Sequence, residues 1–291
     1  MSNASPKPGA RSRLKGVYFH IAMLLVSLVF LAPLVWMLST SVKPEDQAAS
    51  GEIHLLPTPP SSVFAQAADN YSAVWNDRTI RFPLYLRNTL IVAILGVVGM
   101  TLSSAVVAYG LSRVQWRGRG VVFFLVLATM MIPFPVLMVP LYIIFRELGW
   151  TGTLKPLWVP AWFGNAFNIF LLRQFFMTIP PQLDEAARLD CCSHWSIFWR
   201  IILPLAKPAL AVVALFHFIY VWNDFVGPLI FLTDRDQFTL ALGLQLYQSQ
   251  SGNTPWNLLM AASALMISPL VVLFMLTQRT FVQSASTEGL K

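Results

Sequence analysis

Long apolar runs dominate this chain, and short polar stretches separate them. A helix needs about 20 predominantly apolar residues to cross the hydrocarbon core of a bilayer. Six runs meet that requirement, so the pattern predicts six transmembrane helices in an all-α integral membrane protein. They cover residues 17–40, 84–111, 121–145, 157–177, 209–232 and 258–280.

Composition supports the membrane assignment. The 291 residues are 56% hydrophobic and 11% charged, and their mean hydropathy is +0.62. Soluble domains are about 45–50% apolar and about 25% charged, which excludes an ordinary soluble protein. The first run follows Arg11, Arg13 and Lys15, as a signal peptide would. However, it is longer than a signal-peptide core and no small-residue cleavage site follows, so we expect it to remain as a span.

The Lys and Arg residues predict the orientation. If the N-terminus is cytoplasmic, 13 of the 20 Lys and Arg residues fall on the cytoplasmic side. The positive-inside rule therefore predicts that both termini are cytoplasmic. Much of the net charge of +7 then reflects topology, which argues against a nucleic-acid partner. The predicted parts are an inner tail (1–16), the first span (17–40), an external loop (41–83), a core (84–281) and an inner tail (282–291).

One polar segment, residues 180–208, lies inside the core on the predicted cytoplasmic side. Pro180 and Pro181 suit the first turn of a helix. Asp184 and Glu185 follow in that turn, where the helix dipole favours anions. Two interpretations remain open from the residues alone. The segment is either an amphipathic helix lying on the bilayer surface or a helix that docks on another protein.

Recognisable catalytic and metal-binding motifs are missing from the sequence. Cys191 and Cys192 are adjacent, which suits neither disulfide geometry nor the spacing of metal ligands, so we expect two reduced thiols and no metal site. The chain has no G-x-x-x-x-G-K-[ST] phosphate loop and no motif of a serine or zinc hydrolase. We therefore expect no enzymatic activity and no cofactor on this chain.

Polar residues within the predicted spans are candidates for a translocation path. His217, Tyr220 and Asp224 are spaced i, i+3, i+7 and so share one helix face. Ionisable groups inside spans usually face the bundle interior or a cavity. The alternative is packing against a partner subunit, with His217 neutral and hydrogen-bonded. Asn165 and Asn168 also share a helix face. They would either contact the solute or form hydrogen bonds between helices.

Prolines and small residues mark special positions in two spans. Pro133, Pro135 and Pro140 interrupt the third run, which predicts a kink or a break. Gly96 and Gly99 in the second run suit close packing of a neighbouring helix.

Several motifs together resemble a known family. The polar segment contains Glu185-Ala186-Ala187-x-x-Asp190, followed by Leu203-Pro204 and Lys207-Pro208. The fifth run contains Trp222-Asn223-Asp224-Phe225, and Asn88-Thr89-Leu90 begins the second. This combination resembles the carbohydrate permeases of binding-protein-dependent ABC importers, of the maltose-system type. The resemblance covers residues 18–281 and implies the type I ABC importer permease fold.

In that family, residues 180–208 would be the EAA loop, which inserts a coupling helix into a separate ATPase. The first of two sets of site residues is implied by the resemblance, and the second consists of polar residues in the fourth and fifth predicted spans. The ATPase-docking set is Asp184, Glu185, Ala186, Ala187, Asp190 and Cys191. The translocation-path set is His217, Tyr220, Asn223, Asp224, Asn165 and Asn168.

One position departs from the family pattern. The family usually has glycine after the aspartate of the loop, where this chain has Cys191. Glycine adopts a positive φ at little cost, whereas another residue there costs about 1–2 kcal/mol. Either the turn avoids a positive φ or it is strained.

The resemblance also implies the partners. They are a second permease subunit, an ATPase dimer that holds ATP and magnesium, an extracytoplasmic solute-binding protein and the lipid of a bacterial or archaeal cytoplasmic membrane. The expected activity is import of a sugar, oligosaccharide, polyol or glycerol phosphate by alternating access. The alternatives are an ABC permease for another solute, an ion-coupled secondary transporter, and a membrane scaffold or embedded enzyme. Secondary transporters often show internal repeats and buried charges for ion coupling, whereas this sequence shows no clear repeat and no carboxylate at the centre of a predicted span.

Overall fold

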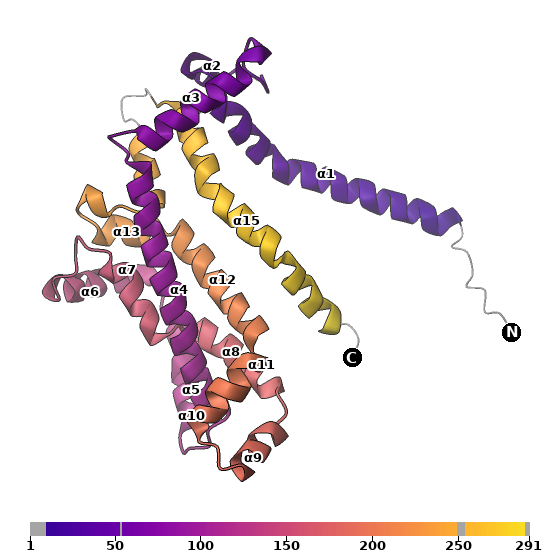
Figure 1. The fold of residues 1–291 in the computed structure, drawn as a ribbon, viewed down its shortest axis with the longest axis vertical. Helices are drawn as coiled ribbons and strands as arrows, with labels where there is room; N and C mark the ends of the chain where they lie inside the picture. The colour runs from indigo at the N-terminus through magenta and orange to yellow at the C-terminus, as the bar shows by residue number, and fades with distance from the viewer. Residues whose placement is uncertain (1–9, 53, 249–253, 289–291) are drawn as a thin grey trace. The chain divides into compact units, whose positions relative to one another are not determined.

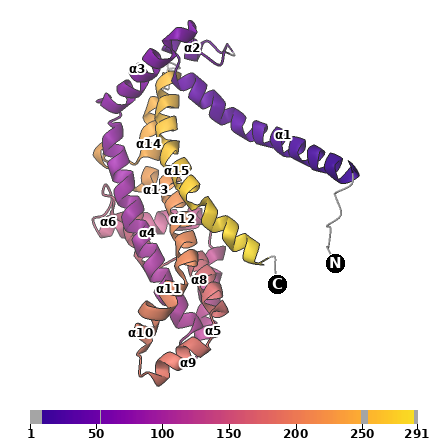
Figure 2. The ribbon, with the colours of Figure 1, turned by 45° about the vertical axis from the view of Figure 1, so that its right-hand side comes forward.

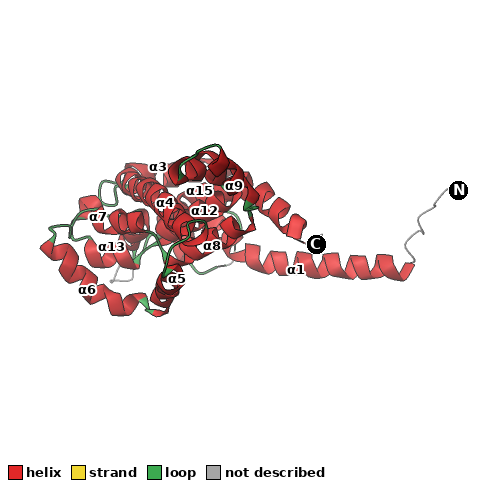
Figure 3. Cartoon of the chain, turned by 90° about the horizontal axis from the view of Figure 1, so that it is seen from below, coloured by secondary structure: helices red, strands yellow, loops and turns green. Residues whose placement is uncertain are grey.

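Helices make up the regular structure of this protein (Figure 1). The computed structural model describes residues 10–52, 54–248 and 254–288, and no strand occurs within these ranges (Figure 3). Packing of the backbone divides the chain into two units, which are Met1–Asp77 with Tyr247–Ser268, and Arg78–Leu246 with Pro269–Lys291.

The first unit includes the first apolar run and residues 41–77 of the predicted external loop. That loop is largely helical. The helices of this part are α1 (Ala10–Ser41), α2 (Glu45–Ala49), η1 (Pro60–Ser62) and α3 (Val63–Asn76). Every residue from 18 to 36 of α1 is exposed, although this stretch is strongly apolar. An apolar surface that extends around a whole helix suits a membrane environment.

Asn70 connects three parts of this unit. Its side-chain amide donates to the carbonyls of Ser41 (2.9 Å) and Lys43 (2.8 Å), at and just after the end of α1. Its carbonyl oxygen accepts from the amide of Asn257 (3.0 Å) in α15 (Trp256–Glu288). Because Asn70 is only 3% exposed, these bonds are formed away from water and hold α3 in a defined position.

The second unit is organised around α4 (Phe82–Ser112), against which α8, α12 and η3 pack. The other elements before residue 180 are α5 (Arg119–Ala128), η2 (Thr129–Met131), α6 (Phe134–Glu147), α7 (Lys155–Trp158), η3 (Val159–Phe163) and α8 (Ala166–Thr178). The later elements are α9 (Gln182–Leu189), α10 (His194–Ile197), the π-helix η4 (Phe198–Ile202), α11 (Leu203–Leu205), α12 (Lys207–Asn223), α13 (Val226–Phe231), η5 (Arg235–Gln237), α14 (Leu240–Leu244) and η6 (Gln245–Tyr247).

Two glycines allow neighbours to approach α4 closely. A Cβ atom on Gly99 would lie 2.4 Å from Cδ1 of Trp162, and one on Gly96 would lie 3.1 Å from Nε2 of His217. Side chains at these positions would collide with η3 and crowd α12. The prediction that Gly96 and Gly99 are close-packing positions is therefore confirmed.

The number of membrane spans depends on how broken helices are counted. In the described ranges, three helices are long and apolar enough to cross a bilayer, and they contain Tyr18–Ser41, Phe82–Ser112 and Trp256–Gln278. Two bent pairs of helices raise the number to five if each pair forms one span. The all-helical class is confirmed, and the total of six spans stays a prediction.

The third apolar run is broken. Its halves, Arg119–Met131 and Phe134–Glu147, meet at 99°. Pro133 disfavours helical geometry at the preceding residue, and Ile132 is accordingly extended, with φ −83° and ψ 111°. Pro140, by contrast, lies inside α6. The break therefore forms at the first proline of the run.

The fourth and fifth runs are also divided. The fourth consists of α7, η3 and an α8 of only 13 residues, and Gly164, with φ 81°, separates η3 from α8. In the fifth run α12 ends at Asn223, Asp224 is extended, and the chain re-enters a helix at α13. Both breaks occur beside predicted site residues.

Candidate functional site

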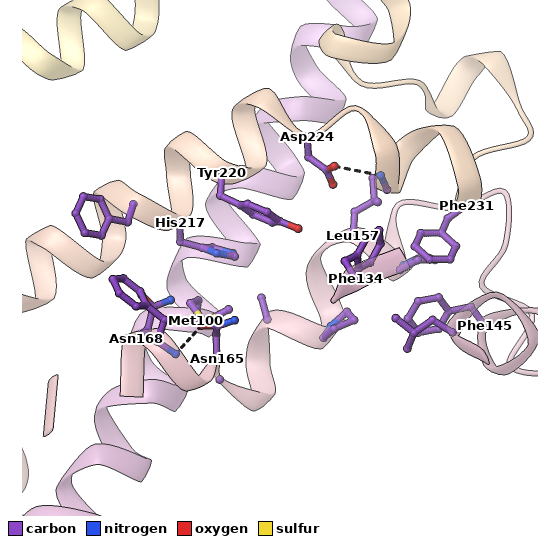
Figure 4. A pocket seen from close by; sticks show the side chains of 18 residues that line it. Met100, Phe134, Phe145, Leu157, Asn165, Asn168, His217, Tyr220, Asp224 and Phe231 are labelled. Carbon is purple, nitrogen blue, oxygen red and sulfur yellow. Dashed lines mark hydrogen bonds between the residues drawn. The ribbon is translucent and has the colours of Figure 1, made fainter. Parts of the chain in front are cut away.

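A cavity of about 400 Å³ lies among the helices of the second unit (Figure 4). Its wall is formed by α4, α6, α7, η3, α8, α12 and α13. Five of the six residues predicted for a translocation path line it, namely His217, Tyr220, Asp224, Asn165 and Asn168. The sixth, Asn223, is exposed and donates to the carbonyl of Ile219 (2.8 Å).

The polar face of α12 has the arrangement that its spacing predicts. His217, Tyr220 and Asp224 all face the cavity (Figure 4). The rings of His217 and Tyr220 lie nearly parallel, with an interplanar angle of 22° and 6.0 Å between their centroids. The helical repeat of 3.6 residues places the three residues on one face of α12.

Two buried polar atoms beside the cavity lack a partner in the described part of the chain. They are Nε2 of His217 and the side-chain oxygen of Asn168. Buried side-chain polar atoms are usually hydrogen-bonded, so an unpaired one needs an explanation. Both residues line the cavity, so these atoms are placed to bind a polar group that enters it.

Asn165 and Asp224 each form a hydrogen bond to the backbone. The side chain of Asn165 accepts from the backbone N–H of Phe167 (2.9 Å) and thereby caps α8. Asp224 accepts from the backbone N–H of Gly227 (3.1 Å) at the start of α13. A Cβ atom on Gly227 would lie 2.5 Å from the Asp224 carboxylate, so glycine leaves the space that the carboxylate occupies. These bonds orient both side chains at the cavity wall.

The rest of the lining is apolar, and sequence reasoning missed it. Aromatic and aliphatic side chains make up much of the wall, among them Met100, Phe134, Phe145, Phe216 and Phe231. None of the 18 lining residues is Lys or Arg. These residues come from elements far apart in the sequence, and no local pattern distinguishes them from lipid-facing residues.

A second candidate site is the polar segment 180–208, here called the coupling loop. Its first helix, α9, divides the six predicted docking residues between two faces. Asp184 and Ala187 are buried within the chain, at 6% and 5% exposure. The other four, Glu185, Ala186, Asp190 and Cys191, are exposed. Asp184 and Ala187 therefore support the loop from inside, and the surface open to a partner is carried by the exposed set. Sequence reasoning missed an exposed apolar residue on this surface, Leu189, which is 86% exposed.

Cys191 ends α9 in the left-handed region, with φ 58°. Its backbone N–H donates to the carbonyl of Arg188 (3.0 Å), and that of Cys192 donates to the carbonyl of Ala187 (2.9 Å). This pair of bonds is the Schellman motif, in which glycine is the usual residue at the left-handed position. Of the two alternatives for this turn, the strained one is present.

Replacing Cys191 by glycine is expected to raise the free energy of unfolding by about 1 kcal/mol, because glycine adopts this φ without a steric clash. Thermal unfolding of the purified protein in detergent measures the change. Cys192 is a matched control because it is partly buried and has no positive φ, so Cys192→Gly should destabilise the protein. Equal effects of the two substitutions would contradict the assignment of strain to Cys191.

Comparison with known proteins identifies the family. Residues 100–287 match the family described as binding-protein-dependent transport system inner membrane component. The chain belongs to this family. The match covers more than half of the chain and includes both the coupling loop and all 18 residues of the cavity lining.

Curated relatives match along nearly the full length. The trehalose/maltose transport system permease protein MalG of Thermococcus litoralis is 34% identical over 96% of this chain and 98% of its own. The arabinooligosaccharides transport system permease protein AraQ of Bacillus subtilis is 31% identical over 92% and 93%. The sn-glycerol-3-phosphate transport system permease protein UgpE of Yersinia pestis is 32% identical over 92% and 94%.

Solved structures share the fold. A chain from a bacterial ABC transporter involved in the import of the acidic polysaccharide alginate superposes with a TM-score of 0.81 at 25% identity, covering 94% of this chain and 99% of that one. A bacterial alginate ABC transporter in complex with a pentasaccharide-bound periplasmic protein gives a TM-score of 0.65 at 16% identity and supports the fold alone.

Proposed function

We propose that this chain is a permease subunit of a binding-protein-dependent ABC importer and that its solute is a carbohydrate. Family membership carries the proposal, together with relatives that are at least 30% identical over more than nine tenths of the chain. Two of these relatives are named for transport of sugars or oligosaccharides. This chain would form one part of the translocation path and would receive mechanical input through the coupling loop.

The chemistry of the cavity suits a carbohydrate. Sugars present hydroxyl groups and apolar ring faces, and the wall combines amide, imidazole and phenol groups with aromatic rings. The unpaired atoms of His217 and Asn168 are available to hydroxyl groups, whereas Phe216 and Tyr220 offer ring faces. Sites of this kind are mainly apolar and use a few polar groups for orientation.

The charge of the lining favours an uncharged solute. The lining has one carboxylate, Asp224, and no Lys or Arg. A buried phosphate or carboxylate is stable only when a cation or several hydrogen-bond donors compensate its charge. A solute such as a glycerol phosphate would need that cation from another chain, so neutral sugars fit this subunit better.

The remaining parts of the transporter would be separate chains. A second permease subunit would complete the path, a pair of ATPase subunits would hold ATP and magnesium, and a solute-binding protein would deliver the sugar from outside. The coupling loop and both termini would then be cytoplasmic, as the distribution of Lys and Arg predicts. Closure of the ATPases would move the coupling loop, and the bundle would open alternately to each side.

Uptake into proteoliposomes tests this function. The transporter, purified with the subunits encoded beside it, is supplied with its binding protein and a panel of labelled maltose, trehalose, arabinooligosaccharides and glycerol phosphate. We expect uptake of a neutral sugar that requires ATP inside the vesicle and the binding protein outside, and that persists when ionophores abolish ion gradients. Uptake driven by an ion gradient without ATP would instead identify a secondary transporter.

A further inference from the structure

The C-terminal end of α4 contacts the coupling loop at α9, at α10 and at η4. Figures 1 and 2 show α9 and α10 at this same end of α4. The hydroxyl of Tyr109 donates to the backbone carbonyl of His194 (3.1 Å), and the Tyr109 ring centroid lies 5.1 Å from that of Phe198. One turn later, Nη1 of Arg113 lies 3.1 Å from the Asp184 carboxylate in α9. Tyr109 in α4 and Arg113, the residue that follows α4, therefore hold two parts of the loop.

Arg113 joins three elements through one guanidinium group. Besides the bond to Asp184, its Nη2 donates to the backbone carbonyls of Phe176 and Ile179, at the end of α8. Carbonyls in the last turn of a helix often need partners from outside the helix. The Phe176 carbonyl also accepts from the backbone N–H of Ile179 (3.2 Å), so Arg113 gives it a second donor. The side chains of Arg113 and Asp184 are only 7% and 8% exposed. Arginine suits this position because its donors form a rigid planar fork.

The geometry of the Arg113–Asp184 ion pair indicates that it positions α9 and adds little to the stability of the fold. Nε of Arg113 and Oδ1 of Asp184 are both buried without a partner in the described part of the chain. Desolvation offsets much of the attraction in a buried ion pair, and the offset is larger when some polar atoms stay unpaired. The pair therefore adds little to overall stability, but it restricts α9 to one position relative to α4 and α8.

We propose that Arg113 is the positioning residue that makes the coupling loop move with α4 and α8 as one body. The inference rests on the proposed function, because it concerns how motion of an ATPase reaches the membrane helices. Between α8 and α9 the backbone is extended at Ile179, with φ −72° and ψ 130°. Without Arg113, this connection would bend, and displacement of α9 would not be transmitted to the bundle.

The test uses the full transporter in proteoliposomes and measures the number of sugar molecules imported per ATP hydrolysed. Arg113→Gln should lower this ratio by about tenfold, within the range of typical coupling between sites. The ATPase should still copurify, because the exposed face of α9 is unchanged. Arg113→Lys should recover only part of the ratio, since one ammonium group cannot bind a carboxylate and two carbonyls in the same plane.

Arg117→Gln is the matched control, because Arg117 is an exposed arginine just after α4 and should tolerate the change. A structural role alone would reduce the amount of assembled transporter and leave the ratio unchanged, which would overturn the proposal. If Arg113→Gln fails to assemble, Asp184→Asn gives a second measurement. This substitution removes the negative charge that faces Arg113 and leaves both bonds from Arg113 to the carbonyls. An unchanged ratio of sugar imported to ATP hydrolysed would again overturn the proposal. Uptake that is independent of ATP in the unmodified transporter would instead overturn the proposed function.

Discussion

Replacing Glu185 by lysine is expected to abolish ATP-driven uptake. Glu185 lies in the first turn of α9 and is exposed, whereas its neighbour Asp184 is buried. The substitution reverses the charge on the surface that we expect to dock on the ATPase, and it places a cation at the positive end of the helix dipole. Misplaced charge in a binding surface costs several kcal/mol, so we expect a loss of more than about tenfold in sugar-stimulated ATP hydrolysis.

The measurement compares copurification of the ATPase with uptake in the same preparation. Glu185→Lys should lose both while the permease still inserts into the membrane. Glu45→Lys is the control, because Glu45 is also an exposed first-turn glutamate, in α2 of the predicted external loop. Normal ATP-coupled uptake by Glu185→Lys would show that α9 does not dock on the ATPase. The result also separates docking from transmission, since Arg113→Gln should keep the ATPase bound.

Replacing Asn88 by aspartate is expected to lower the free energy of unfolding by about 3 kcal/mol, because buried acceptors would then face each other without donors. Asn88 is 5% exposed, and its amide donates to the carbonyls of Asp236 (2.8 Å) and Phe238 (3.0 Å). Thermal unfolding in detergent measures the loss. Asn76→Asp is the control, because Asn76 is exposed and its amide bonds within its own helix to Ser72. If both variants lost similar free energy of unfolding, the effect could not be attributed to burial of Asn88.

The same bonds show that α4 is held at both ends. Near its N-terminus, Thr89 accepts from the backbone N–H of Leu240 (2.8 Å), beside the Asn88 bonds. At its C-terminus, Tyr109 and Arg113 hold the coupling loop. A helix fixed in this way can transmit displacement along its length. The Asn–Thr pair that contributed to the family resemblance therefore has a structural task in this chain.

Local sequence was sufficient to predict the helical class and the family. Apolar runs and the spacing of Glu185, Ala186 and Asp190 are visible without knowledge of contacts. The shared face of His217, Tyr220 and Asp224 was also predictable, because it depends only on the helical repeat. The positive φ at Cys191 was one of two stated outcomes, and the bonds that end α9 show which one holds.

Long-range packing set the features that no local pattern carries. Arg113 counted only as a topological charge in the sequence, since its partners Asp184 and Phe176 are more than 60 residues away. Burial of Asp184 beside the exposed Glu185 depends on which side of α9 faces α4, and hydropathy does not distinguish two adjacent acids. The helices break at Pro133, Gly164 and Asp224, and the chain changes direction at each break. Elements that are distant in the sequence can therefore line one cavity.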